Sequence, residues 1–343
     1  MQGTVEKCSL GERRKQMKTV LEQYCNSFIS NRNVVDAVFK WENDLIVAVC
    51  ASTFMNKEML AESEKLAACK KLLKEGTSVF SNFRGNIELP LISLLAASEQ
   101  PEKKLEVTKQ YYEILKKEFR GSEYLVLAAM VLADMVPAEQ VEPLVLRARA
   151  IYDKMKKDHP FLTSSEDSVY AVLMAVSEKN DDVLMEEMEV CYKKLKERFS
   201  SSNDVQSLAH VLAIADGNAE EKCNKVVALY EALRDADMKY GKYHELVALA
   251  SLALLPVAKE TLAEDIKAVD EFLAEQKGYG FLGMDKKTRM MHAAMIVSGA
   301  YTKSEDTNVA AMVGTLAMVA AQQAAMCAIV ASTAAASAAA SGN

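Results

Sequence analysis

Four histidines are the residues of this chain best suited to bind a metal ion or to transfer protons, and they are His159, His210, His244 and His292. Imidazole is a common metal ligand and titrates near physiological pH. The sequence contains no His-x-x-x-His pair and no His-Glu-x-x-His motif, the spacings that place two zinc ligands on one helix face. Histidines from different helices could still converge, but the pattern favours side chains of the core or its rim. We therefore predict no metal and no cofactor.

A second group of residues could contact a partner. Trp41 and Asp44 precede an apolar stretch, and Arg84 lies in the aromatic segment Asn82-Phe83-Arg84-Gly85. An arginine beside exposed aromatic residues is typical of binding surfaces. Alternatively, Arg84 could donate hydrogen bonds to the last carbonyls of a neighbouring helix. The candidate binding residues are Trp41, Asp44, Phe83, Arg84, His210 and His292.

Motifs typical of enzymes are missing from the sequence. It has no Gly-x-Ser-x-Gly nucleophile turn, no phosphate-binding loop ending in Gly-Lys-Ser or Gly-Lys-Thr, and no dinucleotide fingerprint after a strand. The acidic run Glu186-Glu187-Met188-Glu189 suits the solvated start of a helix, where carboxylates face the positive end of the dipole. The sequence therefore favours a protein without catalytic activity.

The elements that must position these residues follow a repeat. Six anchor residues, each an aromatic residue or a cysteine, recur at spacings of 43, 40, 40, 38 and 42 positions. They are Cys69, Tyr112, Tyr152, Tyr192, Tyr230 and Phe272. In the first five segments an apolar residue stands three positions after the anchor. A fixed period near 40 is typical of stacked arrays, in which one unit alone cannot bury its apolar face.

Each repeat unit has the pattern of two helices, as the segment 121–161 illustrates. Ser122 can cap a helix over 124–135 that is apolar on nearly every side, which predicts a buried helix. Pro137 suits the start of a second helix. The apolar stripe of that helix consists of Val145, Ala148, Tyr152 and Met155. The second helix is therefore expected to be amphipathic and to cover the outside.

These units define the predicted fold and its domains. We expect each buried helix to pair with the amphipathic helix that follows it, for example 205–215 with 223–233. The prediction is an all-α protein, an αα-superhelix (solenoid) of about seven helical hairpins with a period near 40 residues. A polar segment over 1–20 precedes a single array over 21–330, and an Ala- and Ser-rich tail, expected to be disordered, covers 331–343.

The composition indicates the cellular compartment and argues against one class of partner. The formal net charge of −7 argues against nucleic acid, which requires a concentrated basic surface. The seven cysteines are scattered, with no pair spaced for zinc or redox chemistry, as expected in a reducing cytoplasm. Residues 1–21 are polar and charged, so we expect no secretory signal and a cytoplasmic protein.

The C-terminal run of the chain allows two interpretations. No charged residue follows Asp306, and 309–330 is long enough to span a bilayer as a helix. However, the run is rich in Ala, Ser and Thr, and Gln322 and Gln323 interrupt it. We therefore favour a capping helix to about residue 330 over membrane insertion.

Several segments resemble a bacterial protein family, mostly from Firmicutes, that is catalogued as a domain of unknown function. They are 81–85 (Ser-Asn-Phe-Arg-Gly), 121–125 (Gly-Ser-Glu-Tyr-Leu) running into Ala128-Ala129, 290–294 (Met-Met-His-Ala-Ala), and the Ala-, Gln- and Ser-rich tail. The resemblance covers most of the chain. It implies no known activity, cofactor or catalytic residue.

Three functions are consistent with these features. The first is a non-enzymatic scaffold that binds a protein or peptide partner on a concave face, as solenoids commonly do. The second is a small-molecule-binding protein or enzyme with a pocket between hairpins. The third is association with a membrane through the C-terminal run. We favour the first, with the partner's identity and the oligomeric state left open.

Overall fold

The structure is a computed structural model that describes residues 10–40, 42–280, 283–303, 319–320 and 322–331. Within these ranges every regular element is a helix, which confirms the predicted all-α class. The helices are α1 (Leu10–Val38), α2 (Asp44–Asn56), α3 (Ser63–Gly76), η1 (Gly85–Ile87), α4 (Glu88–Ala96), α5 (Pro101–Leu115), α6 (Glu123–Met135), α7 (Ala138–Asp158), α8 (Asp167–Val176), α9 (Asp181–Lys196), α10 (Ser202–Ile214), α11 (Ala219–Asp235), η2 (His244–Leu246), α12 (Val247–Ala253), α13 (Lys259–Ala274) and α14 (Lys286–Lys303).

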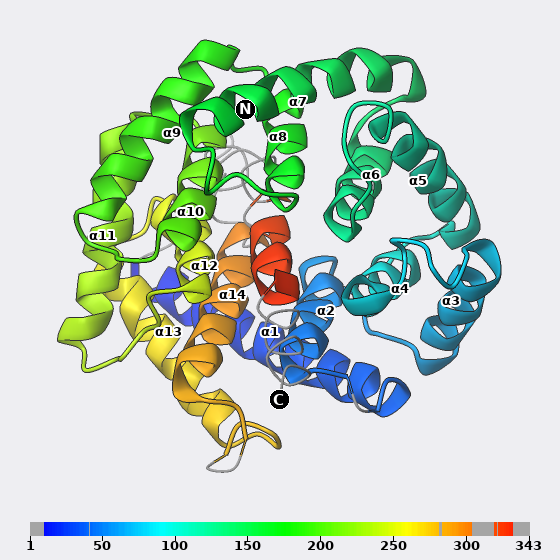
Figure 1. The fold of residues 1–343 in the computed structure, drawn as a ribbon. Coiled ribbons are helices and arrows are strands. Elements are labelled where there is room, and N and C mark those ends of the chain that lie inside the picture. The colour runs from blue at the N-terminus through cyan, green and yellow to red at the C-terminus, as the bar shows by residue number, and fades with distance from the viewer. Residues whose placement is uncertain (1–9, 41, 281–282, 304–318, 321, 332–343) are drawn as a thin grey trace, which may run out of the picture.

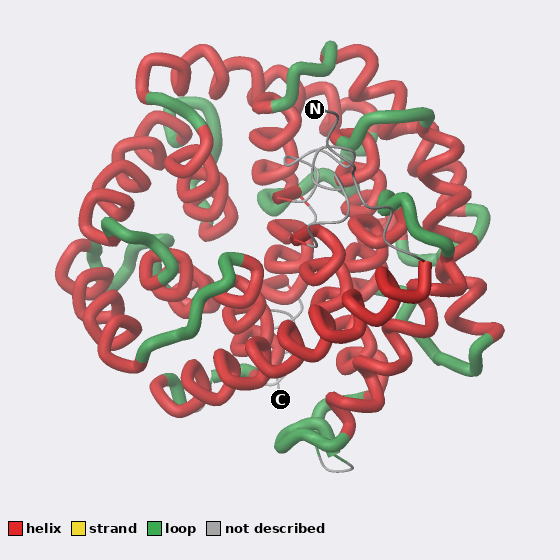
Figure 2. Tube along the Cα trace, turned by 180° about the vertical axis from the view of Figure 1, so that it is seen from behind, coloured by secondary structure: helices red, strands yellow, loops and turns green. Residues whose placement is uncertain are grey.

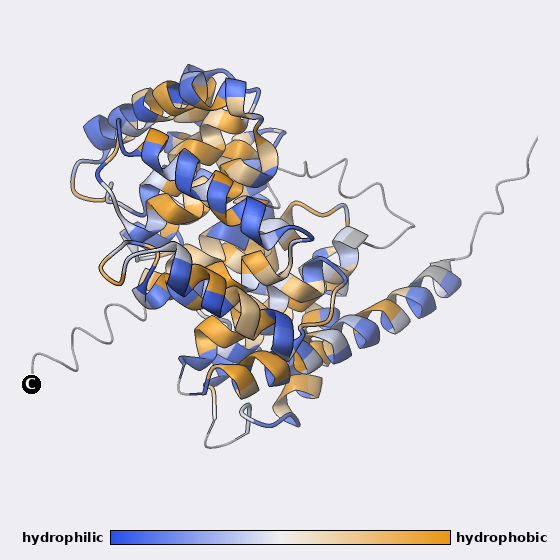
Figure 3. Ribbon diagram, turned by 90° about the vertical axis from the view of Figure 1, so that its right-hand side faces the viewer, coloured by the Kyte–Doolittle hydropathy of each residue, from blue (hydrophilic) through white to orange (hydrophobic). Residues whose placement is uncertain are grey.

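Odd-numbered helices lie on the outside and even-numbered helices on the inside (Figure 1). The burial pattern follows this division. In the inner helix α6 every residue from Leu125 to Leu132 is buried, and the side chain of Ser122 caps its start as predicted. The outer helix α9 buries only a stripe, namely Leu184, Met188, Cys191 and Leu195. Figure 3 shows the outer helices with hydrophilic residues on one side and hydrophobic residues on the other.

The grouping of helices into hairpins differs from the expected one. From α3 onwards each outer helix packs more extensively against the inner helix that follows it than against the one that precedes it, as α9 does with α10 and α5 with α6. The sequence predicts the opposite pairing, of each inner helix with the next outer helix. Connections on both sides are short, since four residues join α8 to α9 and five join α9 to α10. Sequence spacing is therefore compatible with either grouping, and only packing decides between them.

The first and last helices of the ring meet. Helix α1 packs against α14 as well as α2, and α14 also contacts α2 (Figure 2). Arg14 on α1 forms an ion pair of 2.6 Å with Asp265 on α13. Arg32 on α1 donates a hydrogen bond of 2.9 Å to the carbonyl of Lys277. Helix α1 is continuous across residue 20, where the sequence suggested a boundary, and Arg14 lies before that position.

Recurring polar contacts lie at the C-terminal ends of the inner helices. Arg147 on α7 donates to the carbonyls of Ala175, in the last turn of α8, and Ser177, its C-cap, at 2.9 and 2.7 Å, and also to Asp181 of α9 at 2.8 Å. Lys179 donates to the carbonyls of Ala213, in the last turn of α10, and Ala215, its C-cap, at 2.9 and 2.6 Å. Cations at these positions satisfy carbonyls that a helix leaves unpaired and complement the negative end of its dipole. These contacts help to fix the orientation of neighbouring helices.

One further helix lies inside the ring and is called here the central helix: residues 319–331, with residue 321 not described. Figure 1 shows it in red, surrounded by the inner helices. Its buried residues include Ala320, Ala324 and Val330. A helix to about residue 330 is therefore present, but it fills the centre of the ring instead of covering an end. The predicted tail beyond 331, and the segment 304–318, lie outside the described residues.

No helix in the described part of the chain is both long enough and apolar enough to cross a bilayer.

Candidate functional site

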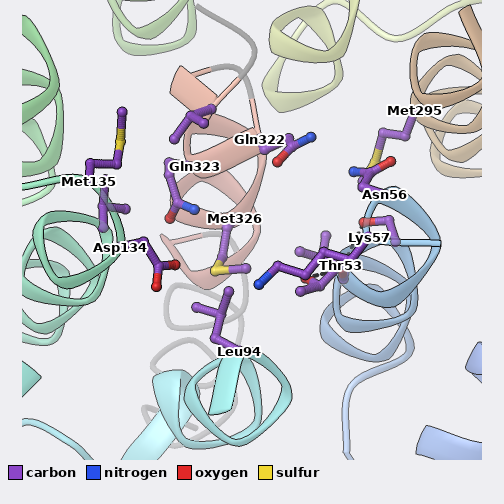
Figure 4. A pocket seen from close by; sticks show the side chains of 14 residues that line it. Thr53, Asn56, Lys57, Leu94, Asp134, Met135, Met295, Gln322, Gln323 and Met326 are labelled. Carbon is purple, nitrogen blue, oxygen red and sulfur yellow. Dashed lines mark hydrogen bonds between the residues drawn. The ribbon is translucent and has the colours of Figure 1, made fainter. Parts of the chain in front are cut away.

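The central helix and the inner helices enclose a pocket of about 200 Å³, called here the central pocket (Figure 4). Helices α2, α4, α6 and α14 contribute to its wall together with the central helix. Its apolar lining residues are Val49, Leu94, Val131, Met135, Met295, Val319 and Met326. Its polar lining residues are Ser52, Thr53, Asn56, Lys57, Asp134, Gln322 and Gln323. This mixture of an apolar wall and a few polar groups is typical of small-molecule sites.

Three of the polar lining residues come from the C-terminal ends of inner helices. Asn56 is the last residue of α2 and Lys57 is its C-cap, while Asp134 lies in the final turn of α6. Inner helices are apolar along most of their length because they are surrounded by other helices. Their ends can carry polar residues. Inside the ring the ends of α2 and α6 therefore bring charged groups to an otherwise apolar space.

Lys57 and Asp134 form the charged side of the central pocket, and Lys104, which does not line the pocket, pairs with Asp134. Lys57 donates a hydrogen bond of 3.2 Å from Nζ to the carbonyl of Ala97, the C-cap of α4. Lys104 on α5 is buried, and its Nζ lies 2.7 Å from Oδ2 of Asp134. Burial lowers the pKa of Lys104, the nearby Asp134 opposes this effect, and the positive charge of Lys57 reinforces it. With both lysines charged, the three groups carry a net charge of +1.

Two buried side-chain oxygens of this pocket, Oε1 of Gln323 and Oδ1 of Asn56, have no hydrogen-bond partner among the described residues. Gln323 is only 7% exposed. Buried polar atoms are paired in the great majority of cases, and leaving one unpaired costs about 1–3 kcal/mol. These two acceptors therefore mark the positions at which a bound molecule would find hydrogen-bond partners.

A second pocket, of about 480 Å³, lies at the other end of the central helix. Glu166 and Asp204 line it at the starts of α8 and α10, with His244 of η2 and Cys327 of the central helix. Burial raises the pKa of Glu166, and the negative charge of Asp204 adds to the effect. Burial also raises the pKa of Asp204, although a hydrogen bond from Ser201 opposes it. This pocket is thus acidic, in contrast to the central pocket.

Three of the predicted binding residues lie in the first part of the ring. Asp44 opens α2 and is exposed, 3.3 Å from Arg32. Phe83 is buried edge-on against Tyr112, with 5.2 Å between ring centroids. Arg84 donates hydrogen bonds of 3.3 Å to the carbonyls of Leu73 and Thr77 at the end of α3, the alternative role that the sequence suggested. Trp41 lies outside the described residues.

The two predicted histidines are fully buried in different parts of the ring. Within the described part of the chain neither ring nitrogen of His210 has a hydrogen bond, and Nδ1 lies 3.5 Å from Oδ1 of Asp167. Nδ1 of His292 lies 2.8 Å from the hydroxyl of Tyr279. Burial lowers the pKa of each histidine to about 3, so both are neutral at pH 7. Across the described residues, histidines, cysteines and carboxylates do not gather in groups that could hold a metal ion.

None of these five residues lines the central pocket, so the structure does not bring the predicted residues together into one site. His210 comes nearest to a pocket, because it packs against Tyr170, which lines the second one, with 4.8 Å between rings. Sequence reasoning missed Lys57, Asp134 and Gln323. A usable signal existed for each, since all three are polar residues at or within an otherwise apolar stretch.

Comparison with known proteins agrees with the resemblance seen in the sequence. Residues 31–324 match the family described as "Protein of unknown function (DUF4003)". The chain is 23% identical over 268 residues to "Uncharacterized protein YeaA" of Bacillus subtilis (strain 168), covering 76% of this chain and 80% of that protein. No solved structure matches the chain. The match over most of its length shows that the chain belongs to the DUF4003 family of proteins of unknown function.

Proposed function

We propose that the chain is a closed array of seven two-helix units that binds a helical segment of a protein partner on its inner surface. The alternation of outer and inner helices and the packing of α1 on α14 support this architecture. One observation supports the proposed binding of a helical segment. The central helix, which lies inside the ring of inner helices, is already seated on the inner surface.

The central helix indicates the chemistry that this surface accepts. Its buried positions include Ala320, Ala324 and Ala325, and small residues let helices approach closely. Met295 of α14 faces the central helix across the central pocket. Methionine adapts to different apolar shapes and is frequent on surfaces that bind several helical partners. The proposed partner segment is therefore an uncharged helix with a face of small and aliphatic residues. It would take the place of the central helix.

Displacement of the central helix in the full-length chain tests this proposal. The substitution Ala324→Glu places a charge at a fully buried position and should release the helix. A labelled peptide of residues 317–333 should then bind the variant in a fluorescence-anisotropy titration. The unsubstituted chain should bind it roughly a hundredfold more weakly, because its own helix competes at high effective concentration.

A peptide that itself carries Ala324→Glu is the matched control and should bind neither chain. Circular dichroism must show that the variant chain keeps its helical content. If the folded variant fails to bind the unsubstituted peptide, or if both chains bind it equally well, the inner surface is not a helix-binding site.

A further inference from the structure

We propose that the central pocket is a binding site for a small apolar α-amino acid in its zwitterionic form. The inference requires the central helix to be seated as described, because this helix supplies part of the wall. Amino-acid binding does not require a protein partner. One of the two proposals, amino-acid binding or peptide binding, can therefore be wrong while the other is right.

The volume and the lining of the pocket indicate the size and the polarity of the ligand's side chain. An engineered apolar cavity of about 150 Å³ accepts benzene, so a pocket of about 200 Å³ has room for a slightly larger molecule. Three methionines, Met135, Met295 and Met326, reach the pocket from α6, α14 and the central helix (Figure 4). Their flexible thioethers suit an aliphatic or thioether side chain of variable shape. Leucine and methionine fit this description.

The charged side of the pocket favours a carboxylate on the ligand. Lys57 and Asp134 reach toward the space from opposite walls, α2 and α6 (Figure 4). Asp134 is already paired with Lys104, whereas Lys57 donates a hydrogen bond to a neutral acceptor, the carbonyl of Ala97. A ligand carboxylate would give the ammonium group of Lys57 a charged partner, and charge-assisted hydrogen bonds are the stronger kind.

The unpaired acceptors favour an ammonium group on the same ligand. Oε1 of Gln323 and Oδ1 of Asn56 are buried oxygens that need donors. An ammonium group offers three N–H donors and no acceptor. Asp134, on α6, adds a carboxylate to the lining of the same pocket. A molecule with one carboxylate, one ammonium group and a short apolar body matches the chemistry of these groups.

Binding should be linked to the docking of the central helix, since a ligand contacting Gln323 and Met326 bridges that helix to α2 and α6. A ligand that binds only the docked form stabilises that form by mass action. The same pocket could therefore report the level of an amino acid through the position of the central helix.

Calorimetric titration of the full-length chain tests the inference, with L-leucine and L-methionine as the probes. Two analogues each lack one charged group: 4-methylpentanoate lacks the ammonium group, and 3-methylbutylamine lacks the carboxylate. We expect the two amino acids to bind and each analogue to bind at least about tenfold more weakly, equivalent to about 1.4 kcal/mol. Equal binding of either analogue, or no binding of either amino acid, would overturn the proposal.

Two substitutions test whether the amino acid binds in this pocket. Gln323→Leu and Lys57→Met should each weaken the binding of L-leucine at least about tenfold. The matched controls Gln140→Leu and Lys267→Met alter exposed residues of α7 and α13 and should leave the affinity unchanged. Thermal unfolding confirms that each variant is folded. If Gln323→Leu and Lys57→Met are folded and bind L-leucine as the unsubstituted chain does, any amino acid binds elsewhere and the assignment is wrong.

Discussion

Arg14 and Asp265 lie 251 positions apart in the sequence, and 2.6 Å separates Nη1 of the arginine from Oδ2 of the aspartate. Asp265 is buried and also accepts a hydrogen bond of 2.7 Å from the hydroxyl of Tyr301. The pair thus joins the start of α1 to α13 and α14. It lies where the two ends of the helix series 10–303 meet.

Removing this carboxylate should destabilise the contact between the two ends of the ring. Asp265→Ala leaves the guanidinium of Arg14 and the hydroxyl of Tyr301 without this acceptor. Hydrogen bonds to charged groups contribute about 1.5–3 kcal/mol, so we expect a loss of about 2 kcal/mol in the free energy of unfolding. Urea unfolding followed by circular dichroism measures it. The neighbouring Glu264 is 73% exposed and also pairs with Arg14, at 3.3 Å, and Glu264→Ala should have little effect. Similar losses in both variants would contradict the role given to Asp265.

The C-terminal end of α10 should depend on one buried lysine. Lys222 is 3% exposed and donates from Nζ to the carbonyl of Ala215, at 2.6 Å, and to Glu187, at 2.7 Å. Lys222→Ala removes a buried cation from a network in which Lys179 still partners Glu187. We expect a loss of about 2 kcal/mol in stability, read from the urea midpoint. Lys225→Ala, at an exposed position of the same helix, is the control. The contact of Lys222 with the end of α10 has no stabilising role if both variants unfold at the same urea concentration.

His210 should make the protein less stable in acid. Its pKa is about 3 in the folded chain, because burial disfavours the imidazolium, and about 6.5 when unfolded. Between these values the unfolded chain binds the extra proton, so this residue's contribution to stability falls as pH decreases below 6.5. The slope reaches at most about 1.4 kcal/mol per pH unit. Unfolding of His210→Leu across pH 4.5 to 8 should therefore show a shallower loss of stability in acid.

Asp167, beside His210, works in the opposite direction. Burial raises its pKa to about 7, so the folded chain binds the extra proton between about 3.9, the unfolded value, and 7. This contribution to stability is present at low pH and is lost as pH rises to 7. Removing His210 leaves this opposing effect in place. An unchanged pH slope in His210→Leu would show that His210 does not stay neutral and buried.

Gly299 should be intolerant of a side chain because α14 approaches α1 and α2 closely there. A Cβ at this position would lie 2.6 Å from Oδ1 of Asn56 and 3.1 Å from Cε of Met55. Both atoms end flexible side chains that can yield to a single methyl group, so the larger valine is the informative substitution. Overpacking costs about 1–3 kcal/mol, and Gly299→Val should lower the melting temperature. Gly280→Val, where a Cβ would meet no atom of the described residues within 4 Å, should not. Equal melting temperatures for the two variants would contradict this close approach.

The sequence by itself determined the helical class and the distinction between buried and amphipathic helices. These features are local, because a helix shows its apolar face within a few turns and Ser122 caps its own helix. In α7 the predicted apolar stripe is buried at Val145, Ala148 and Met155 for the same reason.

Only the tertiary structure decided which helices form hairpins, that α1 packs on α14, and that residues 319–331 fill the centre. It also decided the central pocket, where Lys57, Asp134 and Gln323 meet from three distant segments. The physical reason is that local patterns fix where each helix lies along the chain, whereas the contacts between distant helices depend on how each helix is oriented relative to its neighbours. That orientation is set by side-chain packing and by polar contacts such as that of Arg147 on α7 with Asp181 on α9, which no local pattern encodes.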